Sequence, residues 1–268
     1  MKQIILFLIC FAVSFSGCAS RNLPSKGIGV GFTIKAQSSG YHPLDPLPIK
    51  IICEGELTNK RIMQSLPDET MRIAVGEKNS LGGISYGIAA TGYEGNSYVV
   101  VLDYIKFNTI PFGVKMLSGG GTEVFNLMLP NYLKDPETLE RIVPVYVGVG
   151  LRLTASLTVH QGSVDLGNLF ALGFAAQAKQ ISGTLVVQTL GISGENISSI
   201  IPMPSDINAS TIQNAILSLG SIKAKMYQSD TIITPRVVGI YNNLGGLSGN
   251  INNFISSLLK ESQLLEIK

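Results

Sequence analysis

The sequence contains no tryptophan and few charged residues. Only 14% of its 268 residues are charged, with 20 Lys and Arg against 18 Asp and Glu, whereas about a quarter is typical of soluble proteins. The near-zero charge balance provides no general attraction for phosphate, which disfavours a nucleic-acid-binding protein. Hydrophobic residues make up 45% of the chain, which disfavours disorder. The composition therefore predicts a globular protein of one large domain or two small ones.

Cysteine and histidine are also scarce, with three Cys and two His. His42 and His160 lie far apart, and no pair of these residue types has the spacing of a metal site. Gly119-Gly120-Gly121-Thr122 lacks the Gly-Lys-Ser/Thr ending of a phosphate-binding loop. Cys53 follows an apolar run, where a small buried hydrophobe is favoured over a reactive thiol. We therefore expect no cofactor and no catalytic or metal-binding residue.

The N-terminus has the features of a secretory signal peptide over residues 1–17. Lys2 precedes an apolar run from Ile4 to Val13, which is shorter than the roughly 20 residues of a membrane-spanning helix. Phe15-Ser16-Gly17-Cys18 resembles the lipobox of bacterial lipoproteins, with Phe15 at the position where leucine is usual. The resemblance implies that Cys18 is lipidated and begins the mature chain. Its acyl chains would hold the protein on a membrane, with residues 18–26 as a short tether.

The same resemblance predicts the location of the protein. Ala19 follows the lipidated position, where an aspartate retains lipoproteins of enteric bacteria in the inner membrane. We therefore expect an outer-membrane anchor with the body in the periplasm, and the inner membrane and the cell surface stay open as alternatives. Because Cys10 would leave with the signal peptide and Cys18 would carry lipid, Cys53 has no partner for an internal disulfide.

Alternation of apolar and other residues predicts long strands. The segments 28–36 and 145–159 alternate without a break, and both contain a Gly-x-Gly pattern that lets another backbone approach closely. At about 3.3 Å per residue, 145–159 would extend roughly 50 Å, so it either bends at its glycines or extends beyond the body. Further strands are expected at 49–53, 71–75, 97–107, 181–192 and 231–241, and loops at 42–48, 118–121 and 131–136.

Three helices are expected, all in the second half of the chain. Asp165 would cap a helix over 166–180, Ser210 would cap one over 211–227, and the last would cover 251–267. The segment 166–176 is apolar nearly all round, so it is buried in a core, covered by another subunit or inserted in lipid. These features predict an α+β fold with a mainly antiparallel sheet. Residues 27–268 would form one domain, with a possible sub-boundary near 131–142.

One motif resembles a catalytic one. Gly83-Ile84-Ser85-Tyr86-Gly87 matches the G-x-S-x-G nucleophile elbow of α/β-hydrolases. In a chain rich in glycine and serine, however, chance alone produces such matches often. Glycines also occupy the place where the following helix should begin, and His160 is the only histidine downstream. A serine hydrolase that uses Ser85 is therefore our third hypothesis.

The leading hypothesis is a non-enzymatic, lipid-anchored envelope protein with a structural, assembly or scaffolding role. Low charge, apolar helices and a very long amphipathic strand suggest contact with membrane lipid through Cys18, with copies of itself or with other envelope proteins. The alternative is a periplasmic binding module for an apolar or lipid-like ligand, held between the sheet and the helices.

Overall fold

The computed structural model describes residues 40–81, 83–87, 91–116, 122–128, 141–172, 175–244, 248–260 and 265–267. The signal peptide, Cys18, the tether and the strand expected at 28–36 lie outside the described residues. The loops expected at 118–121 and 131–136 also lie outside them.

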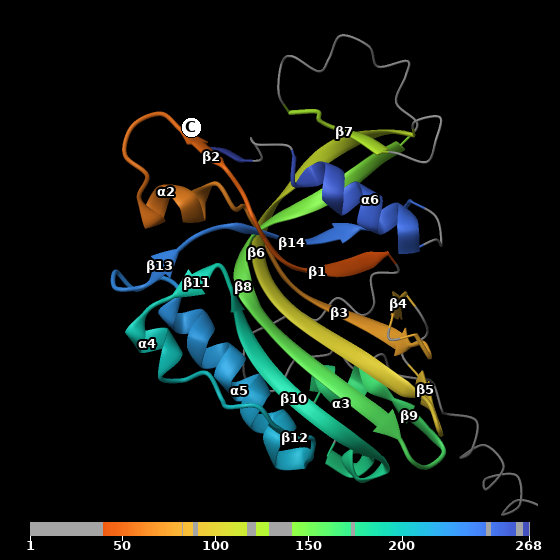
Figure 1. Cartoon of the computed structure of the whole chain (residues 1–268). Coiled ribbons are helices and arrows are strands. Elements are labelled where there is room, and N and C mark those ends of the chain that lie inside the picture. The colour runs from red at the N-terminus through yellow and green to blue at the C-terminus, as the bar shows by residue number, and fades with distance from the viewer. Residues whose placement is uncertain are drawn as a thin grey trace, which may run out of the picture.

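One large antiparallel sheet forms the centre of the fold (Figure 1). Its strands follow the order β1-β14-β8-β6-β3-β4, while β10 continues beside β8, β12 beside β10, and β7 beside β6. The strands are β1 (Tyr41–Pro48), β3 (Asp68–Lys78), β4 (Ile84–Tyr86), β6 (Ser97–Met116), β7 (Thr122–Asn126), β8 (Arg141–Val159), β10 (Ile181–Leu190), β12 (Ser205–Asp206) and β14 (Arg236–Tyr241).

Helices and three small strand pairs surround this sheet. The helices are α2 (Asn59–Gln64), α3 (Leu166–Leu172), the 3-10 helix η3 (Ala175–Gln180), α4 (Glu195–Ser198), α5 (Ala209–Lys225) and α6 (Ser248–Leu258). The small pairs are β2 (Ile51–Cys53) with β15 (Leu265–Ile267), β5 (Thr91–Tyr93) with β9 (Ser163–Asp165), and β11 (Ile192–Ser193) with β13 (Ile232–Ile233). The mainly antiparallel α+β class is confirmed, but α2 lies early in the chain, so the helices are not confined to its second half.

The long strand β8 is curved and is paired along both edges. β6 pairs with it from Arg141 to Thr158, while β14 and then β10 pair with its other edge. A Cβ atom at Gly148 or Gly150 would overlap with the β6 backbone, so these glycines allow the neighbouring strand to approach closely. The strand therefore bends within the sheet and does not project from it (Figure 1).

The expected helices are partly correct. Asp165 accepts a hydrogen bond from the Asn168 backbone N–H at 2.9 Å and so caps α3, which ends at Leu172 before a 3-10 turn. α5 is confirmed within two residues at each end, but its cap is Asn208 instead of Ser210. The expectation of a helix through residue 267 was wrong, because α6 ends at Leu258 and β15 pairs in parallel with β2.

The loop expected at 42–48 was also wrong, because these residues form β1. Its three prolines lack an N–H to donate, and such residues are tolerated in strands at the edge of a sheet. β1 is an edge strand, paired only with β14 among the described strands, and its register shifts between Pro43 and Leu47. The prolines are therefore tolerated, because β1 forms backbone hydrogen bonds with a neighbouring strand along only one of its edges.

Candidate functional site

β1 folds back over one face of the central sheet. α3 and α5 pack against the opposite face of β3, β6, β8 and β10. On the β1 side, the Tyr41 hydroxyl donates a hydrogen bond to Asp103 on β6, and the rings of His42 and Tyr86 lie 5.0 Å apart, edge to face. Tyr86 belongs to β4 at the far edge of the sheet. These contacts show that the sheet rolls, so that its two edges approach each other.

A buried ion pair ties β1 to the middle of the sheet. Arg152 on β8 binds Asp103 on β6 through two hydrogen bonds of 2.7 Å, from Nε to Oδ1 and from Nη2 to Oδ2. Two further N–H groups donate to backbone oxygens, from Nη1 to Leu44 at 2.6 Å and from Nη2 to Val238 at 3.0 Å. Because the Asp103 side chain is fully buried and also accepts from Tyr41, both charges are compensated within the protein.

Burial and charge pairing set the protonation of this group. Burial opposes the charge of Arg152, but the Asp103 carboxylate outweighs it and raises the pKa of the guanidinium above its ordinary value. Burial, followed by the charge of Asp103, raises the pKa of Tyr41 well above that of a free tyrosine. Arg152 is therefore charged and Tyr41 neutral across the physiological pH range, and Tyr41 acts here as a hydrogen-bond donor.

A second cation and three aromatic rings extend this group toward β3. Arg72 lies directly across from Asp103 in the β3–β6 register. Its guanidinium carbon is 5.4 Å from the ring centre of Tyr41, 5.5 Å from that of Phe107 and 4.5 Å from that of Tyr146. These distances are within the range of cation–π attraction. Arg72 and these three rings therefore fill the interior of the rolled sheet beside the Arg152–Asp103 pair.

Next to the ion pair, the rolled sheet encloses an open cleft of about 760 Å³, which we call the β1 cleft. β3, β4, β6, β8 and β10 line it from the sheet, β1 covers it, and α6 contributes one side chain. Its lining combines apolar side chains with polar ones: Pro43, Leu44, Leu47, Ile84, Tyr86, Val99, Val101, Val186 and Ile255 with His42, Asp45, Lys78, Arg152, Thr154, Ser156 and Gln188.

His42 and Tyr86 form one wall of the β1 cleft and are uncharged at neutral pH. Burial lowers the pKa of His42 to about 4 and raises that of Tyr86 to about 12. Arg152 at the floor is already paired with Asp103. The remaining charged residues of the lining are Asp45 and Lys78, of opposite sign. The cleft therefore offers an apolar surface with hydrogen-bonding groups and little net charge.

The structure does not bring together the residues of the hydrolase hypothesis. Ser85 is exposed on the edge strand β4 and not on a strand-to-helix turn. The His160 ring nitrogen Nε2 lies 2.6 Å from the Ser182 hydroxyl of β10. Among the described residues, no hydrogen bond joins Ser85 to His160 or to a carboxylate.

Two other sequence-based interpretations concern Cys53 and the glycines of the long strand. Cys53 is a free thiol, partly buried against the main core. The glycine-bearing face of β8 is approached by the β6 backbone, and the space between the sheet and α3 and α5 is filled by packed side chains such as Leu153, Leu169 and Leu219, each with 0% exposure. This part of the space between the sheet and the helices is therefore occupied by the protein's own core.

Metal-ligand clusters and membrane-spanning helices are absent from the described residues. No group of three His, Cys, Asp or Glu side chains in this part of the chain could hold a metal ion. None of the helices described combines the length and the apolar character needed to span a bilayer.

Arg152 and Asp103 belong to no motif in the sequence. Each is charged within a strand that is otherwise rich in apolar residues, and charges of opposite sign in two such strands can indicate a buried pair. The register that places them opposite each other is a property of the β6–β8 pairing. Comparisons with known protein families, with curated proteins and with solved structures found no match to this chain.

Proposed function

We propose that this chain is a lipid-anchored bacterial envelope protein that binds a small apolar or amphiphilic ligand in the β1 cleft. The observation that carries the proposal is the cleft itself, an opening of about 760 Å³ with apolar walls and several polar groups. Sites for small molecules have this character and typically measure about 300–1,000 Å³. The anchor on Cys18 and the periplasmic location at the outer membrane remain part of the proposal.

The geometry of the polar groups favours a ligand that is held and not transformed. Four of the five N–H donors of Arg152 are engaged by Asp103, Leu44 and Val238. Among the described residues, no hydrogen bond joins the Thr154 or Ser156 hydroxyl of the cleft to a histidine or carboxylate that could activate it. A rigid wall with unactivated hydroxyls suits recognition of a ligand's polar end.

The apolar helix and the long strand suggested an assembly role, but contacts within one copy of the chain account for both. Leu166, Leu169 and Phe170 of the apolar helix have 0% exposure and belong to the protein's own core. β8 is paired along both edges. Self-association stays a prediction, which sizing of the unlipidated protein at several concentrations would test, but the β1 cleft favours binding as the primary role.

A cleft-filling variant tests the proposal. The mature chain carrying Cys18→Ser, which keeps it unlipidated, would be titrated with the apolar fluorophore N-phenyl-1-naphthylamine. Ser156→Phe places a ring in the β1 cleft and should weaken binding about tenfold or more. Ser221→Phe is the matched control, because it introduces the same ring at an exposed serine of α5 that does not line the cleft. Equal binding by both variants would contradict the proposal.

A further inference from the structure

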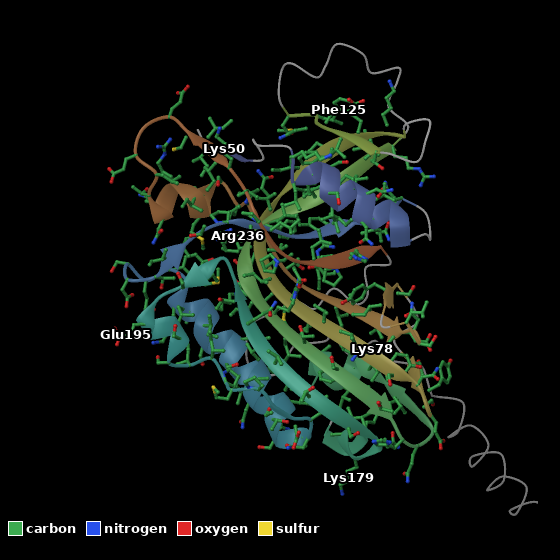
Figure 2. All side chains as sticks on the ribbon, in the orientation of Figure 1. Lys50, Lys78, Phe125, Lys179, Glu195 and Arg236 are labelled. Atoms are coloured by element: carbon green, nitrogen blue, oxygen red, sulfur yellow. The ribbon has the colours of Figure 1, made fainter. Side chains whose placement is uncertain are left out.

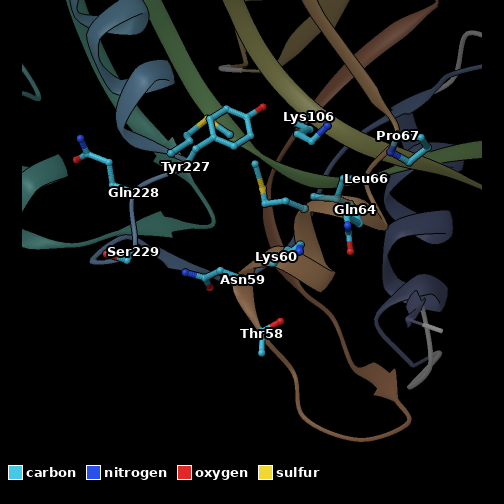
Figure 3. A pocket seen from close by; sticks show the side chains of 12 residues that line it. Thr58, Asn59, Lys60, Gln64, Leu66, Pro67, Lys106, Tyr227, Gln228 and Ser229 are labelled. Atoms are coloured by element: carbon cyan, nitrogen blue, oxygen red, sulfur yellow. The ribbon is translucent and has the colours of Figure 1, made fainter.

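A second pocket of about 830 Å³ lies away from the β1 cleft, and we call it the Lys106 pocket. Side chains come from α2 and its flanks, from β6, and from the end of α5 with the turn that follows: Thr58, Asn59, Lys60, Met63, Gln64, Leu66, Pro67, Lys106, Met226, Tyr227, Gln228 and Ser229. Figure 3 shows Lys106 and Tyr227 on one side of the pocket and Asn59 and Lys60 on the other. None of its residues lines the β1 cleft.

The charge of this lining is entirely positive. It contains two lysines, Lys60 and Lys106, and no Asp or Glu. Lys106 is half-buried on β6, and its ammonium group makes no hydrogen bond or ion pair with any residue that the structure describes. Because this ammonium group is not one of the buried polar groups that lack a partner, it is accessible from the pocket. An anion in the pocket could pair with it directly.

The nearest carboxylate is already committed to other groups. Glu69 faces Lys106 across the β3–β6 register, but its Oε1 binds Lys223 at 2.7 Å and its Oε2 accepts from the Tyr227 hydroxyl at 3.3 Å. Burial raises the pKa of Glu69, but the hydrogen bonds from Lys223, Tyr104 and Tyr227 together outweigh it and hold the pKa below the ordinary value. Glu69 is thus an ion-pair partner of Lys223 and not of Lys106.

The rest of the lining combines neutral donors with an apolar base. The Asn59 side chain is fixed by its hydrogen bond to the Thr231 backbone oxygen, at 2.5 Å, which holds α2 beside the turn that follows α5. Met63 is partly exposed and brings an unbranched thioether, which adapts to irregular apolar ligands, and the exposed Tyr227 ring adds apolar surface. Such a base beside two ammonium groups suits a molecule with an anionic end and an aliphatic portion.

We propose that the Lys106 pocket binds an anionic amphiphile, in which a phosphate or similar anion pairs with Lys106 and Lys60 while an aliphatic portion contacts Met63 and the Tyr227 ring. This site is independent of the ligand proposed for the β1 cleft. Two sources share this chemistry, a phospholipid of the membrane and a soluble amphiphile, and the test separates them.

The test is calorimetric titration of the mature Cys18→Ser chain with n-octyl phosphate below its micellar concentration. Octyl phosphate should bind, while inorganic phosphate, which lacks the tail, and n-octyl glucoside, which lacks the charge, should bind at least about tenfold more weakly. Lys106→Gln should weaken octyl phosphate binding about tenfold or more, since hydrogen bonds to charged groups contribute roughly this much. Lys106→Arg should retain it.

Controls distinguish a specific site from general attraction. Lys179→Gln removes the same charge from an exposed position on η3 (Figure 2) and should leave affinity unchanged. Ser156→Phe, which fills the β1 cleft, should also leave it unchanged, so the failure of either site can be recognised separately. Thermal unfolding of each variant would confirm that the chain is folded.

Sedimentation with phosphatidylglycerol vesicles identifies the source of the ligand. Vesicle binding that Lys106→Gln abolishes would support a membrane phospholipid, and Lys106-dependent binding of octyl phosphate without vesicle binding would support a soluble amphiphile. The proposal is overturned if octyl phosphate does not bind, if Lys106→Gln binds it as tightly as the parent chain, or if inorganic phosphate binds equally well.

Discussion

Replacing Arg152 with methionine should destabilise the protein strongly. The change removes both hydrogen bonds to Asp103 and the donors to the Leu44 and Val238 carbonyls. It leaves the fully buried Asp103 side chain with the Tyr41 hydroxyl as its remaining partner. Breaking a buried ion pair in this way costs about 3–5 kcal/mol of unfolding free energy.

The loss should be measured by equilibrium unfolding in urea, followed by far-ultraviolet circular dichroism because the chain has no tryptophan. Lys78→Met removes an exposed cation at the rim of the β1 cleft and should change stability by less than about 1 kcal/mol. Asp103→Leu combined with Arg152→Met should cost less than the sum of the single changes by at least about 2 kcal/mol. A loss below about 1 kcal/mol for Arg152→Met, or strict additivity, would refute the reasoning.

Three further predictions concern stability. His42 has a pKa of about 4 in the fold and about 6.5 in an unfolded chain. Between these pH values the folded chain binds fewer protons than the unfolded chain, so stability should fall by about 2–3 kcal/mol from pH 7 to pH 4.5. His42→Phe should remove most of this dependence in urea titrations, and an unchanged slope would contradict the assignment. Gly150→Ala should lower stability by at least about 2 kcal/mol, because its Cβ would overlap with the Tyr104 carbonyl oxygen. Ser156→Ala on the same strand should cost less than about 1 kcal/mol. Equal losses would show that the close approach of the β6 backbone to Gly150 is unimportant. Asn208→Ala should lower stability by about 1 kcal/mol in thermal melts, because it removes the cap of α5. Ser210→Ala should be nearly neutral, and the reverse order would assign the cap to Ser210.

Local patterns in the sequence correctly predicted the elements whose buried residues recur at regular intervals along the chain. The alternation over 145–159 predicted β8 because one face of that strand packs into a continuous core. The apolar stripe of α5 was equally informative, since Ile212, Leu219 and Ile222 are buried together. Here the local preference and the tertiary environment agree.

The elements that were missed depend on partners far along the chain. β1 contains three prolines, and its pairing with β14 decides its conformation. β15 has a helix-compatible sequence, but its parallel pairing with β2 makes it a strand. The candidate sites were missed for the same reason. The Arg152–Asp103 pair arises from the register of β6 and β8, and the Lys106 pocket arises from contacts between α2 and the turn after α5.

The most direct test of the proposed function is native mass spectrometry of the protein purified from its own membranes. Spectra of the parent chain, of Ser156→Phe and of Ser221→Phe would be compared after release from detergent. The proposal predicts one additional bound mass, recoverable by organic extraction, in the parent chain and in Ser221→Phe, and its loss in Ser156→Phe. A parent chain that is repeatedly empty, or a bound mass that Ser156→Phe retains, would contradict ligand binding in the β1 cleft.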